Sequence, residues 1–235
     1  MVMWSMFGPG SRRFRPAISV ALVLVLVLTS SLGALNLASD RARGPSNYDF
    51  SVERELVDVS IKKDGSVDID YTFDFTNYGY LDGVDIGLPN GYYDAGSAYA
   101  SIRVGGQSFS PSSISKSPYI ANGLAVEFTP TTISYISYSG TSFTLQFHVN
   151  NPHMVYLNEL KEGTAGIRFR PTWFSSEYQR GFTNELRARI FFPEGFTNVS
   201  EAVYLQDQPW DNITFDSSRG LVVAAWTWNS DWLFT

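Results

Sequence analysis

Alternating apolar and polar residues run through this chain from Tyr48 onward, and they limit its fold more than any other feature. Residues 57–61 alternate, and residues 67–75 alternate again after the turn sequence Lys63-Asp64-Gly65-Ser66. Alternation places every second side chain on the same face of a strand. The two runs and their Gly-containing turn therefore predict a β-hairpin.

Short apolar runs separated by Gly, Pro, Asn and Ser continue this pattern along the chain, and no helix of normal length competes with them. The runs cover residues 84–88, 98–104, 124–128, 143–149, 165–169, 186–192, 202–205 and 221–228. Gly105-Gly106 reads as a hairpin turn. We expect an all-β fold, an antiparallel β-sandwich, because a second sheet is the simplest cover for one-sided strands. Breaks at residues 150–163 allow either one large sandwich or two immunoglobulin-like subdomains.

The first 43 residues have the pattern of a targeting or membrane-anchoring segment and not of a further part of this fold. Arg12, Arg13 and Arg15 precede an uncharged stretch whose centre is almost pure Ala, Ile, Val and Leu. This is the pattern of a signal peptide, with Ser31 and Gly33 spaced as a cleavage site, or of an uncleaved hydrophobic membrane helix. Both alternatives place residues 44–235 outside the cytoplasm, as a secreted or membrane-anchored region.

Composition narrows the function classes. The chain has no Cys, so disulfides, thiolate metal sites and Cys nucleophiles are excluded. The formal charge is −6, and residues 44–235 alone hold 12 basic and 22 acidic side chains, or −10. An acidic chain of this kind is a poor partner for nucleic acid, so the partners we expect are the membrane, through the N-terminal segment, and a protein or glycan.

Two acidic neighbourhoods were considered as cation sites. Asp68, Asp70 and Asp74 have even spacing and share one face of a predicted strand, and Asp82, Asp85 and Asp94 lie in turn-like sequence. Calcium binds clusters of such oxygens, but a solvated strand face and turn chemistry explain both sets without a metal. We expect no metal and no cofactor.

Catalytic motifs do not emerge from the remaining residues. His148 and His153 flank an Asn-Asn-Pro turn with no fixed geometry as a pair, and no Gly-x-Ser-x-Gly elbow accompanies them. A glycosidase would need two carboxyls across a cleft, and the candidates are dispersed. They are Glu127, Glu159, Glu177, Glu185 and Asp211. We therefore expect no catalytic residues and a chain that is not an enzyme.

Aromatic residues and glycosylation sequons are the other candidate features. Exposed aromatic strand faces can bind sugars, but strand aromatics are more often core, which we favour here. The residues in question are Trp173, Tyr178, Trp210, Trp226, Trp228 and Trp232. Asn198 and Asn212 lie in Asn-x-Ser/Thr sequons and are candidate glycosylation sites.

Several segments resemble the exported domain of uncharacterised predicted membrane proteins of bacteria and archaea, a domain-of-unknown-function family. They are Tyr48–Phe50, Val57–Ile61, Asp64–Val67, Val84–Pro89, Phe169–Phe174 and Arg189–Gly195. The resemblance implies an outward β-domain flanked by membrane helices, and it brings no catalytic residues. The chain departs from the family by ending at Thr235 before a second hydrophobic segment, which we interpret as a truncated carboxyl end.

These observations favour a membrane-associated, extracytoplasmic β-sandwich that acts as a surface, interaction or scaffolding module. The alternative is a carbohydrate-binding module that uses exposed aromatic residues. A cell-envelope hydrolase with paired carboxylates has the least support.

Overall fold

A computed structural model describes residues 48–157, 165–196, 199 and 210–229. These residues form thirteen strands and one short helix. The elements are β1 (Phe50–Ile61), β2 (Val67–Asn77), β3 (Gly83–Gly87), β4 (Asp94–Val104), β5 (Gln107–Phe109), β6 (Ser113–Lys116), β7 (Gly123–Glu127), α1 (Pro130–Ile136), β8 (Thr141–Asn151), β9 (Val155–Leu157), β10 (Ala165–Ile167), β11 (Glu185–Phe191), β12 (Asn212–Asp216) and β13 (Leu221–Asn229). The all-β class predicted from the alternation is confirmed for this part of the chain.

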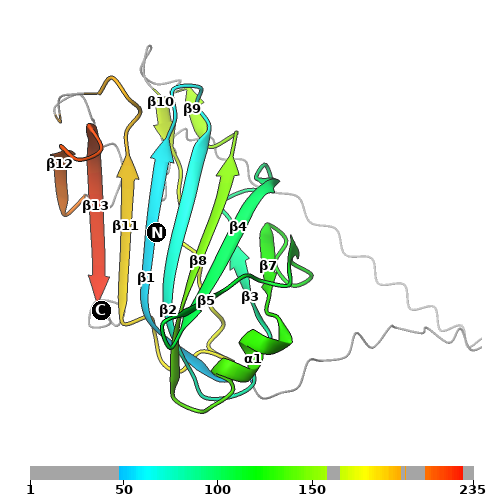
Figure 1. Cartoon of the computed structure of the whole chain (residues 1–235). Helices are drawn as coiled ribbons and strands as arrows, with labels where there is room; N and C mark the ends of the chain where they lie inside the picture. The colour runs from blue at the N-terminus through cyan, green and yellow to red at the C-terminus, as the bar shows by residue number, and fades with distance from the viewer. Residues whose placement is uncertain (1–47, 158–164, 197–198, 200–209, 230–235) are drawn as a thin grey trace, which may run out of the picture. The chain divides into compact units, whose positions relative to one another are not determined.

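An eight-stranded sheet dominates the fold, with the order β12-β13-β11-β1-β2-β8-β4-β5 (Figure 1). Its pairs are antiparallel except for β1 and β11, which run parallel. The antiparallel pairing expected from the sequence is therefore found for every pair of this sheet except one. Two parallel neighbouring strands need a long connection that brings the chain back to the same end of the sheet. Here that connection is the sequence from the end of β1 at Ile61 to the start of β11 at Glu185.

The β1–β2 hairpin at the centre of this sheet confirms the prediction made from residues 57–75. Val57 pairs with Tyr71 and Val59 with Ile69, so the apolar residues of both strands share one face. Gly65 closes the turn at φ 83°, a conformation that favours glycine, and the Asp64 carboxylate accepts a hydrogen bond from the Ser66 amide. The hairpin predicted at Gly105-Gly106 is also present, between β4 and β5.

Two smaller sheets and one helix complete the described fold. The three-stranded sheet has the order β3-β7-β6, and β9 pairs with β10. Thr129 caps α1 by accepting a hydrogen bond from the Thr132 amide. The strands β6, β9 and β12 were not predicted.

A single hydrophobic cluster joins the inner face of the large sheet to the three-stranded sheet. Phe73 and Leu145 come from the large sheet, and Ile86 and Leu124 from the small one; each is almost completely buried. Alternation along β1, β2 and β8 therefore produces two chemically different faces: an apolar face toward this cluster and a polar face away from it.

The signal peptide or membrane helix predicted for residues 1–43 lies outside the described residues, which begin at Tyr48. Within the described ranges, no helix is long and apolar enough to cross a bilayer. Strands from both sides of residues 150–163 belong to the eight-stranded sheet. A subdomain boundary in that segment stays a prediction, since residues 158–164 are not described.

Candidate functional site

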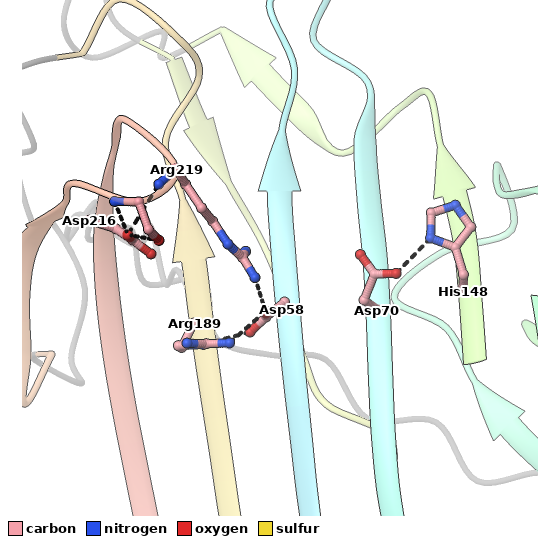
Figure 2. Close-up of polar contacts among 7 residues, drawn as sticks. Asp58, Asp70, His148, Arg189, Asp216 and Arg219 are labelled. Atoms are coloured by element: carbon pink, nitrogen blue, oxygen red, sulfur yellow. Dashed lines mark hydrogen bonds and ion pairs between the residues drawn. The ribbon is translucent and has the colours of Figure 1, made fainter. Parts of the chain in front are cut away.

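A row of polar side chains crosses the outer face of the large sheet. The strand register places Arg189, Asp58, Asp70, His148 and Tyr99 next to one another, on β11, β1, β2, β8 and β4. Figure 2 shows the first four of these side chains on their strands. Asp58 and Asp70 are direct cross-strand partners, an arrangement in which like charges repel.

Each of these two aspartates has a basic partner on its other side. Arg189 donates two hydrogen bonds of 2.6 Å to Asp58, one to each carboxylate oxygen, and Arg219 lies 3.4 Å away (Figure 2). Both guanidinium groups also lie over the Phe191 ring. Two-point binding of a carboxylate by Arg fixes orientation as well as charge, so this end of the row is an ordered charged surface.

At the other end, His148 forms a hydrogen bond of 2.7 Å through Nδ1 to Asp70 (Figure 2). The exposed Tyr99 ring stacks on His148 with centroids 4.5 Å apart. Five side chains from five strands therefore form a continuous outward row of charged and aromatic groups.

The other aspartates of β2 are paired as well. Lys62 lies 2.8 Å from Asp68, and Arg54 lies 2.6 Å from Asp74. The prediction that Asp68, Asp70 and Asp74 share one face is confirmed, and each of the three carboxylates contacts a basic side chain. Among the described residues, no group of three or more His, Cys, Asp or Glu side chains converges as a metal site.

Glu55 is the exception among the carboxylates of the two central strands. It lies on the inner face of β1 with 1% of its surface exposed, and its Oε1 has no hydrogen-bond partner among the described residues. Burial raises the pKa of Glu55 well above its ordinary value of 4.5. The register shift between Val52 and Arg54 precedes this inward turn.

A chain of hydrogen bonds runs from the inner face of β2 to the small sheet. The Thr172 amide donates to the hydroxyl of the buried Tyr71, and the Thr172 hydroxyl accepts from the Gly87 amide of β3. Burial, with a smaller contribution from the neighbouring Glu55, raises the pKa of Tyr71 well above 10.0. The segment that contains Thr172 thus fastens the two sheets together.

A third feature is a group of aromatic side chains at the end of the large sheet where β8 finishes. We call Tyr92, His153 and Tyr156 the ring cluster. Tyr92 is 65% exposed and Tyr156 is 51% exposed. The Tyr92 and His153 rings meet edge to face with centroids 5.4 Å apart. These large rings are open to solvent at fixed positions, which is typical of a binding surface.

The structure separates the two histidines that sequence analysis considered together. His148 belongs to the outer row, whereas His153 belongs to the ring cluster. The other candidate carboxylates form local contacts: Glu185 pairs with Arg187, and Asp211 accepts from the Thr227 amide. Glu177 is exposed, and Glu159 lies outside the described residues.

One group of carboxylates does come together. Burial raises the pKa of Asp85 on β3, and the nearby charges of Asp82 and Glu127 raise it further, against a hydrogen bond from Ser117. Tyr48 donates to Asp82, and Ser113 donates to Glu127. Asp94 instead stabilises its own turn by accepting from the Gly96 amide. Of the three aspartates grouped from the sequence, Asp82 and Asp85 therefore lie together, and Asp94 lies apart from them in its own turn.

The tryptophans that the structure describes differ in burial, and some are core residues whereas Trp173 is exposed. Trp226 is 3% exposed and packs against Trp210, and Trp228 is partly buried against the core, as favoured from the sequence. Trp173 is 67% exposed, and Tyr178 is exposed beside Tyr48. Trp232 lies outside the described residues.

Of the sequon asparagines, Asn212 is exposed at the start of β12. Asn198 falls in a stretch that the structure does not describe.

Sequence analysis missed Glu55, the Arg189–Asp58 pair and the ring cluster. Glu55 was detectable, because it stands two residues before Val57 and continues the inward phase of the strand. The ring cluster left no signal, because Tyr92 and His153 are 61 positions apart in the sequence.

No family model and no curated protein matches this chain. Solved structures that match are a proposed protease from Parabacteroides distasonis, at 14% identity and a TM-score of 0.43, and a mutant zinc metallopeptidase of the M1 class from Deinococcus radiodurans, at 13% and 0.42. A two-domain M1 zinc metallopeptidase mutant bound to L-arginine matches at 12% and 0.43. The matches cover 76–77% of this chain but only 35–39% of theirs.

These matches correct the expectation that the chain is not an enzyme, because the matching structures are a proposed protease and two metallopeptidases. That expectation rested on missing motifs, and catalytic groups can converge in space from distant positions without leaving one. At TM-scores of 0.42 and 0.43 the likeness assigns neither catalytic residues nor a substrate to this chain. The resemblance to exported domains of predicted membrane proteins stays a prediction.

Proposed function

We propose that the chain is a membrane-associated, extracytoplasmic β-protein that binds a partner, as a surface-interaction or scaffolding module. The ring cluster is the observation that carries this proposal. Exposed aromatic side chains concentrate binding energy in protein interactions, especially where they are held in one conformation. The basic and hydrophobic N-terminal segment supports an extracytoplasmic location.

The finer architecture belongs to the same proposal. The eight-stranded and three-stranded sheets are the two layers of a β-sandwich in which the smaller sheet covers part of the larger one. Their shared hydrophobic cluster and the Tyr71–Thr172–Gly87 hydrogen bonds support this description. N-glycosylation at Asn212 is compatible with its exposure at the start of β12.

Location is tested by labelling intact cells with a membrane-impermeant, amine-reactive biotin reagent. Lys63 and Lys116 are exposed and give diagnostic peptides in mass spectrometry. We expect both to be labelled in intact cells that express the full chain. Labelling that requires cell lysis would show the location to be wrong. N-terminal sequencing of the product then separates a mature end at residues 34–44 from an intact anchor.

Partner binding is tested with the purified full chain in detergent and washed cell envelopes of the source organism. We expect the chain to bind the envelopes and Tyr92→Ala to weaken binding about tenfold, the value of one well-placed ring. Tyr138→Ala is the matched control, because Tyr138 is 75% exposed and precedes the opposite end of β8. Equal losses in the two variants would contradict a role for the ring cluster.

A further inference from the structure

We propose that the ring cluster is a binding site for neutral glycans, with one sugar ring seated against Tyr92 and His153. This inference rests on the proposed function and names the ligand class of the same site. The glycan alternative considered from the sequence relied on strand tryptophans, but Trp226 is core. The rings that are open to a ligand come instead from the loop before β4 and the turn after β8.

The relative orientation of the rings suits a cyclic ligand. Tyr92 and His153 lie at an interplanar angle of 75°, so one ring forms a floor and the other a wall. A pyranose presents C–H groups on its faces and hydroxyls around its edge. Its face can therefore pack on one ring while its edge meets the other, as in other contacts between C–H groups and aromatic faces.

Two asparagines hold this arrangement in place. The Asn90 side-chain oxygen Oδ1 accepts from the Tyr92 amide and from the Asn151 side-chain nitrogen, and the Asn90 side-chain nitrogen donates to the His153 backbone carbonyl. Asn151 is completely buried and accepts from the His153 amide. The Tyr156 hydroxyl donates to the His153 carbonyl. A site fixed in this way loses little conformational entropy when a ligand binds.

Polar groups with free bonding capacity complete the site. Among the described residues, nothing forms a hydrogen bond with the Tyr92 hydroxyl or with the His153 ring nitrogens, and both side chains are exposed. A phenol and an imidazole can each donate or accept, which matches sugar hydroxyls. The site therefore offers both contacts that a sugar requires: aromatic faces and neutral hydrogen-bonding groups.

Charge favours a neutral ligand over an anionic one. Residues 88–94 and 150–157, which build the cluster, contain no Lys or Arg, and Asp94 at their border is exposed. Residues 44–235 carry a formal charge of −10. Phosphorylated or uronic ligands would meet repulsion without a basic partner. The small size of the cluster also favours a sugar over a protein, which buries about 800 Å² on each partner.

The test uses the full chain in detergent with chitohexaose, cellohexaose, laminarihexaose and mannohexaose, and polygalacturonate as the anionic comparison. Binding is measured by biolayer interferometry. We expect at least one neutral hexasaccharide to bind, with about tenfold weaker binding for Tyr92→Ala and unchanged binding for Tyr138→Ala. Thermal unfolding of both variants checks that each is folded.

A second measurement separates this proposal from the proposed function. Cell envelopes are treated either with periodate, which cleaves sugar diols, or with protease, and then presented to the chain. Protease should leave binding intact, and periodate should abolish it where the glycan carries vicinal diols, as 1,4-linked glucose or mannose does. Binding that survives periodate but not protease would overturn the glycan site while leaving the interaction module intact. Failure of every neutral hexasaccharide, or an equal loss in Tyr138→Ala, would also overturn it.

Discussion

Acidic side chains have opposite surroundings on the two faces of the β1–β2 pair. On the outer face, Asp58 and Asp70 are direct neighbours, yet Arg189 binds the first and His148 the second. On the inner face, the cross-strand neighbours of Glu55 are Phe73 and Leu186, and no residue that the structure describes forms a hydrogen bond with its Oε1. The same strands thus carry a balanced polar surface and one isolated buried carboxyl.

The contrast shows that burial matters more than the number of charges. The outer aspartates repel each other, but water and basic partners reduce that repulsion to a small cost. For Glu55 the cost comes from the loss of water, since burial is the cause of its raised pKa. One buried acid is therefore expected to affect folding stability more than the whole outer row.

The largest expected effect follows from replacing Glu55 with leucine, which matches its apolar row. Because burial raises the pKa of Glu55, the folded chain holds a proton that the unfolded chain loses near pH 4.5. Stability of the natural chain therefore falls as pH rises from 4.5 toward the raised folded pKa. We expect Glu55→Leu to remove the contribution of Glu55 to this slope, leaving that of Asp85, and to add about 1–3 kcal/mol to the unfolding free energy at pH 8.

Urea unfolding between pH 4 and pH 8 measures this effect. Glu53→Leu is the matched control on the same strand, because the Glu53 carboxylate accepts from Ser51 and Asn184 and gains nothing from an apolar replacement. A Glu55→Leu variant that keeps the pH slope, or that is less stable than the natural chain at pH 8, would show that Glu55 does not lie in an apolar setting.

The central hairpin could be predicted because each of its strands has one buried and one solvent-facing side, which gives an alternating sequence. The Lys63–Ser66 turn and the glycines at 105 and 106 follow from local chemistry in the same way. The outward position of Asp68, Asp70 and Asp74 needed only strand periodicity. Features that depend on short-range rules were therefore visible in the sequence.

Other features depend on which strands become neighbours. The parallel contact of β1 with β11 brings Arg189 to Asp58 across 131 positions, and no local pattern indicates it. The ring cluster likewise requires the loop before β4 to meet the end of β8. Glu55 lies between these cases: its phase was visible, but its lack of a partner could only be seen in the folded chain.

A medium effect is expected at the parallel pair of the outer face. Arg189→Met keeps much of the side-chain volume over Phe191 but removes both hydrogen bonds to Asp58, which then faces Asp70 with only Arg219 nearby. We expect a loss of about 1 kcal/mol in thermal or urea unfolding. Asp58→Asn in the same chain should recover part of it, because the repulsion disappears. A double variant no more stable than Arg189→Met would contradict this account.

The smallest effect is expected from His148→Phe, which retains an aromatic ring for Tyr99 to stack on but removes the hydrogen bond to Asp70. Asp70 is half exposed, so water replaces the lost partner and the cost is about 0.5 kcal/mol or less. Repeating all three substitutions in 1 M NaCl tests the comparison as a whole. Salt reaches the outer face and should reduce the losses in Arg189→Met and His148→Phe. It cannot reach Glu55, so the gain in Glu55→Leu should persist, and a gain that vanished with salt would place Glu55 among solvated charges instead.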